Sequence, residues 1–212
     1  MIFTVSIYSR IVRKLRLWAN GCLTWTSACG IACLTLLIRT HAWHWRKVAK
    51  AGPPPWDVRN RVIADFIPDG SSVLDLGCGA QTLKLHLKSG CTYQPCDVIT
   101  NSPDTIHCDF NAGIYPKIIK RYDYVVCSGL LEYVRTPSEF LQRISSFGDA
   151  LLISYNPIVH GESKIQRLGK HWVNHLAQPE LERIFESIGL SWNIVNTRPP
   201  NELLYSCKPK TE

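Results

Sequence analysis

The sequence "SSVLDLGCGAQTLKLHL" (residues 71–87) decides the fold. Its apolar run, residues 72–77, predicts a buried strand. Gly77 and Gly79 follow at once and predict a tight turn, since glycine adopts backbone conformations that a β-carbon disfavours. After this turn, residues 80–90 predict a helix that ends at Gly90. A strand, a glycine turn and a helix begin a unit of a parallel sheet, and such sheets bind ligands at the carboxyl ends of their strands.

The rest of the body repeats this alternation. Short apolar runs predict further strands over residues 91–97, 105–110, 122–129 and 150–155, and amphipathic patterns predict helices over residues 57–67, 137–147 and 179–190. Two last strands, residues 191–197 and 202–208, surround an "RPPN" turn and predict an antiparallel edge pair. The sequence therefore predicts an α/β, doubly wound, mostly parallel seven-stranded sheet with an antiparallel edge strand.

The net charge of +7 is unevenly distributed along the chain. The first 50 residues hold eight Lys or Arg and no Asp or Glu, whereas the remaining 162 residues hold 16 basic and 17 acidic groups. The body is thus close to neutral, which argues against a nucleic-acid-binding surface on it.

The N-terminal segment forms a separate unit by composition. Residues 17–38 lack any charged side chain, and as a helix they would span roughly 33 Å. Polar residues make this run less apolar, and basic residues flank both of its ends. The sequence therefore decides neither whether the segment spans a membrane nor how it would be oriented. Three interpretations stay open: a helical arm packed on the body, a helix at an anionic membrane surface through residues 10–50, and a spanning helix. The domain organisation expected is an arm (1–50), a proline-rich linker (51–56) and a catalytic body (57–212).

The cysteines give no sign of a disulfide framework or a metal site. There are nine, an odd number, without a C-x-x-C pair or histidines at zinc spacing. Several lie in apolar, strand-like runs, where cysteine behaves as a small hydrophobic residue. We expect no metal and a reducing, cytoplasmic location, with peripheral contact at the inner face of the membrane left open.

The glycine turn carries the first chemical signal. A nicotinamide-binding fingerprint would place a third glycine at position 82, which is Thr82. Asp75 lies two residues before Gly77, where a carboxylate suits a cationic ligand better than a pyrophosphate. With Asp75, Gly77 and Gly79 the stretch resembles motif I of the class I S-adenosylmethionine-dependent methyltransferases, and departs from it at Gln81. The resemblance implies a Rossmann-like fold and S-adenosylmethionine as cofactor.

Three later segments extend the resemblance over residues 57–207. Asp97 ends the second strand, where the family keeps an acid for the ribose hydroxyls. Asp109 and Phe110 follow the third strand, where the resemblance implies an acid near the adenine amino group and a ring beside the base. "CSGLLEYV" (127–134) is similar to the segment that closes over the cofactor. The cofactor-binding residues so implied are Asp75, Gly77, Cys78, Gly79, Asp97, Asp109, Phe110 and Ser128.

The methyl acceptor is less well defined. The fourth strand lacks the Asn/Asp-Pro-Pro-aromatic signature of amino-directed nucleic-acid methyltransferases, so a nucleic-acid base is disfavoured. The long connection at 156–176 contains Trp172, Asn174 and three candidate bases, His160, His171 and His175, since imidazole titrates near neutral pH. We expect a small-molecule, glycan or lipid-linked acceptor. The alternative is a catalytically inactive binding or scaffold protein; the atom methylated and the oligomeric state are left open.

Overall fold

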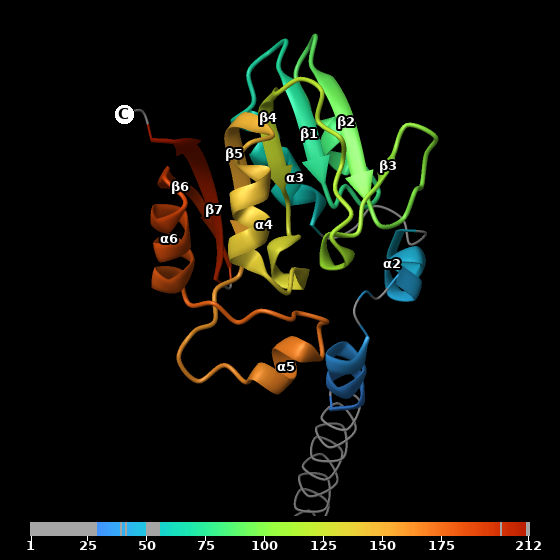
Figure 1. Cartoon of the computed structure of the whole chain (residues 1–212), viewed down its shortest axis with the longest axis vertical. Helices are drawn as coiled ribbons and strands as arrows, with labels where there is room; N and C mark the ends of the chain where they lie inside the picture. Colours follow the sequence, from blue (N-terminus) through green and yellow to red (C-terminus); the bar gives the residue numbers. More distant parts are fainter. Residues whose placement is uncertain (1–28, 39, 41, 50–55, 200, 211–212) are drawn as a thin grey trace, which may run out of the picture.

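The computed structural model describes residues 29–38, 40, 42–49, 56–199 and 201–210. Its centre is a seven-stranded sheet in the order β3-β2-β1-β4-β5-β7-β6 (Figure 1). The strands are β1 (Ser72–Leu76), β2 (Thr92–Asp97), β3 (Ile106–His107), β4 (Tyr122–Cys127), β5 (Gly148–Tyr155), β6 (Leu190–Arg198) and β7 (Glu202–Pro209). This architecture confirms the predicted sheet.

Strand direction changes only at the C-terminal edge. β1 to β5 pair in parallel, whereas β7 inserts antiparallel between β5 and β6. The order reverses at β1, which lies between β2 and β4. The carboxyl ends of neighbouring strands diverge at such a point and leave a crevice in which ligands bind.

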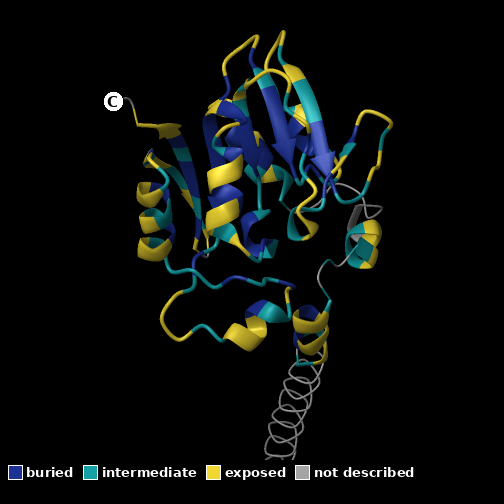
Figure 2. Ribbon diagram, in the orientation of Figure 1, coloured by how far each residue is buried: buried dark blue, intermediate teal, exposed yellow. Residues whose placement is uncertain are grey.

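Helices cover both faces of the sheet. The helices are α2 (Ala42–Ala49), α3 (Asp57–Asp65), α4 (Pro137–Ile144), α5 (Lys164–Leu168) and α6 (Gln178–Ser187), and residues 29–37 are also helical; short 3-10 turns are η1 (Thr82–Leu85), η2 (Phe110–Ala112) and η3 (Leu131–Tyr133). α4 and α6 lie on one face and α3 on the other (Figure 1). The exposed sides of α4 and α6 face solvent, away from the sheet (Figure 2).

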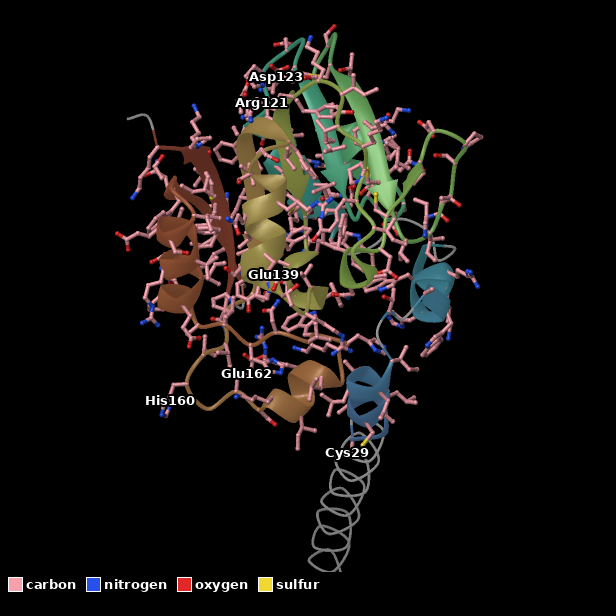
Figure 3. All side chains as sticks on the ribbon, viewed as in Figure 1. Cys29, Arg121, Asp123, Glu139, His160 and Glu162 are labelled. Carbon is pink, nitrogen blue, oxygen red and sulfur yellow. The ribbon has the colours of Figure 1, made fainter. Side chains whose placement is uncertain are left out.

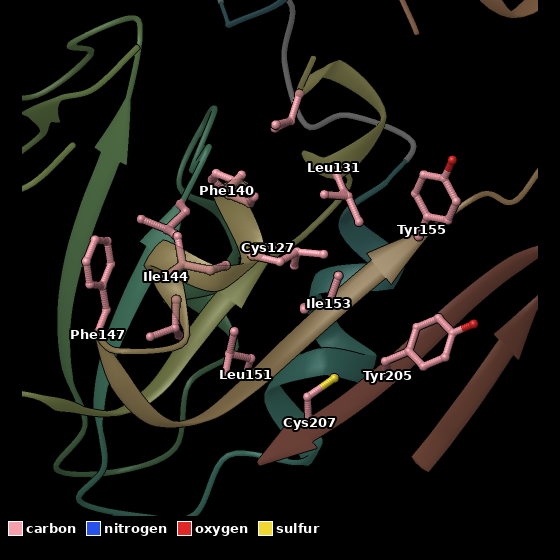
Figure 4. Packing of buried hydrophobic residues seen from close by; sticks show 14 of the residues in the cluster. Cys127, Leu131, Phe140, Ile144, Phe147, Leu151, Ile153, Tyr155, Tyr205 and Cys207 are labelled. Carbon is pink, nitrogen blue, oxygen red and sulfur yellow. The ribbon is translucent and has the colours of Figure 1, made fainter. Parts of the chain in front are cut away.

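Alternation along the strands divides the core in two. Leu74, Val125 and Leu151 belong to the cluster that includes Phe140 of α4 and Phe185 of α6; Figure 4 shows Leu151 and Phe140 within this cluster. Their neighbours in sequence, Val73, Val126 and Leu152, pack with Ile63 and Ile67 on the α3 side. Successive side chains of a strand point to opposite faces, so a strand buried on both sides is apolar throughout.

The helix predicted over residues 80–90 is wrong. Only the 3-10 turn η1 forms there, and Gln81 before it has the left-handed conformation, with φ +58° and ψ +30°. That conformation interrupts a right-handed helix at its first turn. Asn60 of α3 then donates a hydrogen bond to the Thr82 hydroxyl over 2.7 Å, which holds the turn against α3. The apolar residues of this segment are therefore placed by a short 3-10 turn, and no α-helix forms.

The part of the arm that the structure describes packs on the body. Residues 29–37 are helical and are followed by α2. The Thr35 hydroxyl donates to the Leu168 carbonyl, and Arg135 donates to the carbonyls of Thr35 and Ile38 at the end of the helix. Among the described residues, no helix has both the length and the apolar character needed to cross a bilayer. Most of the uncharged run, residues 17–28, and the linker residues 51–55 lie outside the described residues.

Candidate active site

A cavity of about 290 Å³ lies at the carboxyl edge of the parallel strands. Its volume is near the lower end of the range for ligand pockets, about 300–1,000 Å³. Segments that follow β1, β2, β3, β4 and β5 all contribute to its wall, together with α3 and the arm. The residues used below are Thr40, Trp45, Trp56, Arg59, Gly77, Gly79, Asp97, Asp109, Phe110, Ser128, Gly129, Glu132, Tyr133, Asn156 and Trp172.

The glycine turn after β1 gives the cavity a backbone floor. Gly77 has φ +72° and Gly79 has φ +52°, conformations that favour glycine. A β-carbon on Gly77 would lie 2.9 Å from Leu130 Cδ1. The turn therefore needs glycine at position 77 for both conformation and space.

Asp97 ties the turn to the end of β2. Its Oδ2 accepts the N–H of Gly79 over 2.9 Å, and its Oδ1 accepts the N–H of Ile99 over 2.9 Å. Burial raises the pKa of this carboxyl, and the two N–H donors oppose that rise. A carboxylate has about four lone-pair sites, so Asp97 can still accept from a ligand in the cavity.

Asp109 and Phe110 form the wall after β3. Asp109 caps η2 by accepting the N–H of Ala112, and the same oxygen accepts the hydroxyl of Thr40 from the arm over 2.9 Å. The Phe110 ring packs against Tyr115 and Phe140, with centroids 5.2 and 5.1 Å away. One acid and one ring thus lie together on this wall, held from below by the core and from outside by the arm.

Asp75 and Cys78 are not among the residues that line the cavity. Asp75 points to the α3 side of the sheet, is only 2% exposed, and accepts the Tyr93 hydroxyl over 2.7 Å. Burial raises the pKa of Asp75 to about 7. Burial likewise raises the pKa of the Cys78 thiol far above its ordinary value. Asp75 therefore supports the turn from beneath.

Arg59 of α3 brings a cation to the cavity that the sequence patterns did not indicate. Its guanidinium donates to the Ser128 hydroxyl over 2.7 Å and forms an ion pair with Glu202 over 2.6 Å. A β-carbon on Gly129 would lie 2.4 Å from this guanidinium, so the Ser128–Gly129 turn is shaped around it. Ser128, predicted at this wall, also donates to the Asn60 side chain.

None of the three candidate histidines lines the cavity. His160 is exposed on the loop after β5, well away from the strand ends (Figure 3). His171 is buried beside the arm, where its Nδ1 lies 3.1 Å from the Thr35 hydroxyl. His175 is partly buried, and burial lowers its pKa. Of the neighbouring candidates, Trp172 lines the cavity, while Asn174 bonds backbone carbonyls and the Tyr155 hydroxyl.

The arm supplies cavity residues that sequence reasoning missed. Thr40 and Trp45 come from it, and Trp56 precedes α3. Trp45 contacts Tyr133 edge to face, with centroids 4.7 Å apart. The tryptophans near the linker were the available signal for this contact, because aromatic side chains of this size usually bury a large apolar area against another part of the protein. Among the described residues, no group of three or more His, Cys, Asp or Glu is placed to hold a metal ion.

The strand order, the antiparallel β7 and a cavity at the strand ends define the fold of the class I methyltransferases. Residues 42–191 match the family model described as a methyltransferase domain, and the chain belongs to this family.

Individual relatives are more distant. A bifunctional methionine biosynthesis protein, MetXA/MetW, from Rhodopirellula baltica is 27% identical over 163 residues; the match covers 68% of this chain and 25% of that protein. This chain thus spans about a quarter of that relative. A Burkholderia thailandensis N1-methyltransferase, solved with 1,6-didemethyltoxoflavin and S-adenosylhomocysteine, has a TM-score of 0.56 at 16% identity, covering 74% of this chain and 79% of that one. The N-terminal domain of EvdMO1, solved with S-adenosylhomocysteine and D-fucose, has a TM-score of 0.53 at 17% identity, covering 76% and 85%. The similarity to these two structures is a similarity of fold alone.

Proposed function

We propose that this protein is an S-adenosylmethionine-dependent methyltransferase that acts on a small-molecule, glycan or lipid-linked acceptor. The observation that carries the proposal is that a glycine turn and a buried acid at the next strand end share one cavity wall. Membership of the methyltransferase-domain family supports it. Two fold neighbours, crystallised with S-adenosylhomocysteine and a small molecule or a sugar, agree with this acceptor range.

The chemistry of the wall fits this cofactor part by part. Asp97 would accept hydrogen bonds from the two ribose hydroxyls with the lone pairs that Gly79 and Ile99 leave open. Phe110 would pack beside the adenine, and Asp109 would accept from its amino group. Arg59, which also bonds Ser128 and Glu202, would pair with the carboxylate of the methionine part. Gly77 and Gly79 allow the backbone to approach without a β-carbon between.

S-adenosylmethionine supplies a methyl group on a positively charged sulfonium. The protein's share is alignment of the acceptor with that methyl group and exclusion of water, plus a base where the acceptor must lose a proton. Trp45, Tyr133 and Trp172 lie on the same cavity and suit the exclusion of water.

The test is calorimetry of the full chain with S-adenosylhomocysteine. We expect the wild type to bind, and Asp97→Asn to bind about tenfold or more weakly, since hydrogen bonds to a charged group are worth about 1.5–3 kcal/mol. Asp123→Asn is the matched control: this carboxylate accepts from Ser72 at the opposite end of the sheet (Figure 3). Folded wild-type protein that fails to bind would overturn the proposal.

An inactive binding or scaffold protein is the alternative. It would bind S-adenosylhomocysteine equally well but release none from S-adenosylmethionine with any acceptor. A screen of acceptors with a labelled methyl donor separates the two functions.

We also propose that the outer face of the arm contacts an anionic membrane surface. Leu36 and Leu37 are 62% and 83% exposed, and Leu34 and Trp43 are exposed as well. The arm carries basic but no acidic residues. Apolar side chains with flanking cations bind the interface of anionic membranes. Such contact would hold the cavity, which Thr40 and Trp45 line, close to a lipid-linked acceptor.

A further inference from the structure

Glu132 is a buried carboxylate in the cavity wall with one oxygen unused. It lies in η3, directly after β4, and is 1% exposed. Its Oε1 accepts the N–H of Asn156 over 2.9 Å and the side-chain amide of the same residue over 2.8 Å. Its Oε2 is excluded from water and has no hydrogen-bond partner in the described part of the chain.

An unpartnered buried carboxylate oxygen is costly. A buried polar group without a hydrogen bond destabilises a protein, and the effect is larger if the group is charged. Burial raises the pKa of Glu132, while the Asn156 donors and the charge of Arg59 oppose that rise. A group kept in this state is suited to receive a proton from a ligand.

The other two carboxylates on the cavity wall, Asp97 and Asp109, already accept hydrogen bonds that hold neighbouring segments of the chain. Asp97 holds the glycine turn and the segment after β2 with one oxygen each. Asp109 caps η2 and binds Thr40. Glu132 therefore differs from both: one of its oxygens has no hydrogen-bond partner among the described residues, and the proposed cofactor contacts do not use it.

Trp45, Tyr133 and Trp172 line the same cavity as Glu132. Trp172 Nε1 donates to the Tyr133 hydroxyl over 3.2 Å, and Trp45 meets the Tyr133 ring edge to face. The Trp172 ring is held by the Arg167 guanidinium and the Lys170 ammonium, each 4.6 Å from its centroid. Rings fixed in this way can meet another ring edge to face, an arrangement that aromatic pairs favour.

We propose that Glu132, Trp45 and Trp172 form the acceptor site for an aromatic ring that bears a hydroxyl group, an assignment that rests on the proposed function. The hydroxyl oxygen bonds to the methyl carbon while the carbon–sulfur bond breaks, and the hydroxyl proton passes to Glu132 Oε2. The sulfonium becomes a neutral thioether and the carboxylate becomes a neutral acid, so atoms and charges balance.

An aromatic hydroxyl fits this site better than an aliphatic one. A phenol such as the tyrosine side chain titrates near pH 10, so its proton is within reach of a carboxylate whose basicity burial increases. A sugar hydroxyl is a far weaker acid and offers no flat π face to Trp45 and Trp172.

The test uses the full chain and phenol as the probe, with cyclohexanol as the matched non-aromatic alcohol. In the presence of S-adenosylhomocysteine, we expect phenol to quench tryptophan fluorescence at lower concentration than cyclohexanol does. Trp172→Leu should weaken phenol binding about tenfold, whereas the affinity for S-adenosylhomocysteine should stay unchanged.

Transfer of a labelled methyl group to phenol tests Glu132 itself. Glu132→Gln keeps the acceptor for Asn156 and should lower the transfer rate at least ~100-fold, the range of a lost general base, and flatten its pH profile. Glu139→Gln, on the exposed side of α4, is the control (Figure 3). Glu132→Asp keeps a carboxyl group and should retain more transfer than Glu132→Gln.

Three results would overturn this assignment while the cofactor proposal stands: S-adenosylhomocysteine binds but phenol does not, cyclohexanol binds equally well, or Glu132→Gln transfers at the wild-type rate. If S-adenosylhomocysteine itself fails to bind, both proposals fail together.

Discussion

Gln81 stands where the methyltransferase motif has its third glycine, and its backbone explains that preference. The residue has φ +58°, a conformation that costs a side-chain-bearing residue about 1–2 kcal/mol. Its side-chain amide donates to the hydroxyls of Ser102 over 2.6 Å and Thr105 over 2.9 Å. These hydrogen bonds offset the strain and direct the side chain to the segment before β3. Gln81 does not line the cavity, so we expect cofactor binding to tolerate it.

A pair of substitutions separates the strain at Gln81 from its hydrogen bonds. Gln81→Ala loses both bonds and keeps the strain, whereas Gln81→Gly loses the bonds and relieves the strain. We expect the glycine variant to be more stable than the alanine variant by about 1 kcal/mol in urea unfolding, because the relieved strain of about 1–2 kcal/mol exceeds the roughly 0.5–1 kcal/mol that the freedom of glycine in the unfolded chain costs. Equal stability would contradict a left-handed backbone at this position.

Asp75 makes the stability of the protein depend on pH. Its pKa is about 7 in the folded protein and 3.8 when unperturbed. Between about pH 4 and pH 7, the Asp75 carboxyl is ionised in the unfolded chain but still protonated in the folded protein. The free energy of unfolding therefore falls as pH rises through this range. Below pH 4 this loss is absent, and above pH 7 it is complete.

Asp75→Asn should remove this loss while still accepting the Tyr93 hydroxyl. We expect the free energy of unfolding of the variant, relative to that of the wild type, to be roughly 2 kcal/mol higher at pH 8 than at pH 5. Urea unfolding of the free protein at both pH values measures the difference. Asp65→Asn, an exposed residue that ends α3, is the control and should show no such trend. A gain independent of pH would mean that Asp75 is ionised in the folded protein throughout this range.

At the scale of elements, the sheet was predictable because burial on both faces leaves a simple pattern. The apolar runs 72–77, 122–129 and 150–155 correspond to β1, β4 and β5, which lie at the centre of the sheet. The run 105–110 is a weaker case, since β3 pairs over Ile106–His107 alone at the sheet edge. Residues 80–90 could not be assigned correctly, because the left-handed Gln81 and the contact of Thr82 with α3 depend on the tertiary structure.

The same reasoning divides the site residues. Gly77, Gly79, Asp97, Asp109, Phe110 and Ser128 were predictable as cavity residues because each follows a parallel strand, and those ends meet at one edge. Arg59 and Trp45 came from no strand-end pattern. Glu132 lies in the segment 127–134 that follows the fourth strand, but nothing in that segment indicated which of its residues would keep a buried oxygen without a partner. Arg59 reaches the cavity through an ion pair with Glu202, 143 positions away, and Trp45 through the docking of the arm. Contacts of that range have no local signal in the sequence.

At the scale of the whole molecule, the arm joins the cavity to a surface that faces solvent. Its inner side holds Ala32 and Thr35, which are buried, and its outer side exposes the leucines of the proposed membrane contact. Arg46 and Lys47 of α2 are exposed as well. The direction of this surface is fixed, because Arg135 and Thr40 bond the arm to the body.

Sedimentation with vesicles tests this surface. The full-length protein should sediment with vesicles containing anionic lipid, less with neutral ones, and less in high salt. Leu36→Asp with Leu37→Asp should reduce sedimentation. Leu85→Asp is the matched control, since Leu85 is 77% exposed on the body. Equal sedimentation of all three proteins, or none for the wild type, would rule out the membrane contact at these leucines.

The hydrogen bonds that hold the arm also set when it can dock. Arg135 lies 100 and 97 positions after the carbonyls it binds, and the partners of Thr35 lie 133 and 136 positions after it. A ribosome releases the arm long before it has made Arg135, Leu168 or His171. Contacts of such separation form late, because a long loop must close before they give any stabilisation. The arm is made before the residues that hold it, so it can cover the cavity only once Arg135, Leu168 and His171 have been made and brought to it.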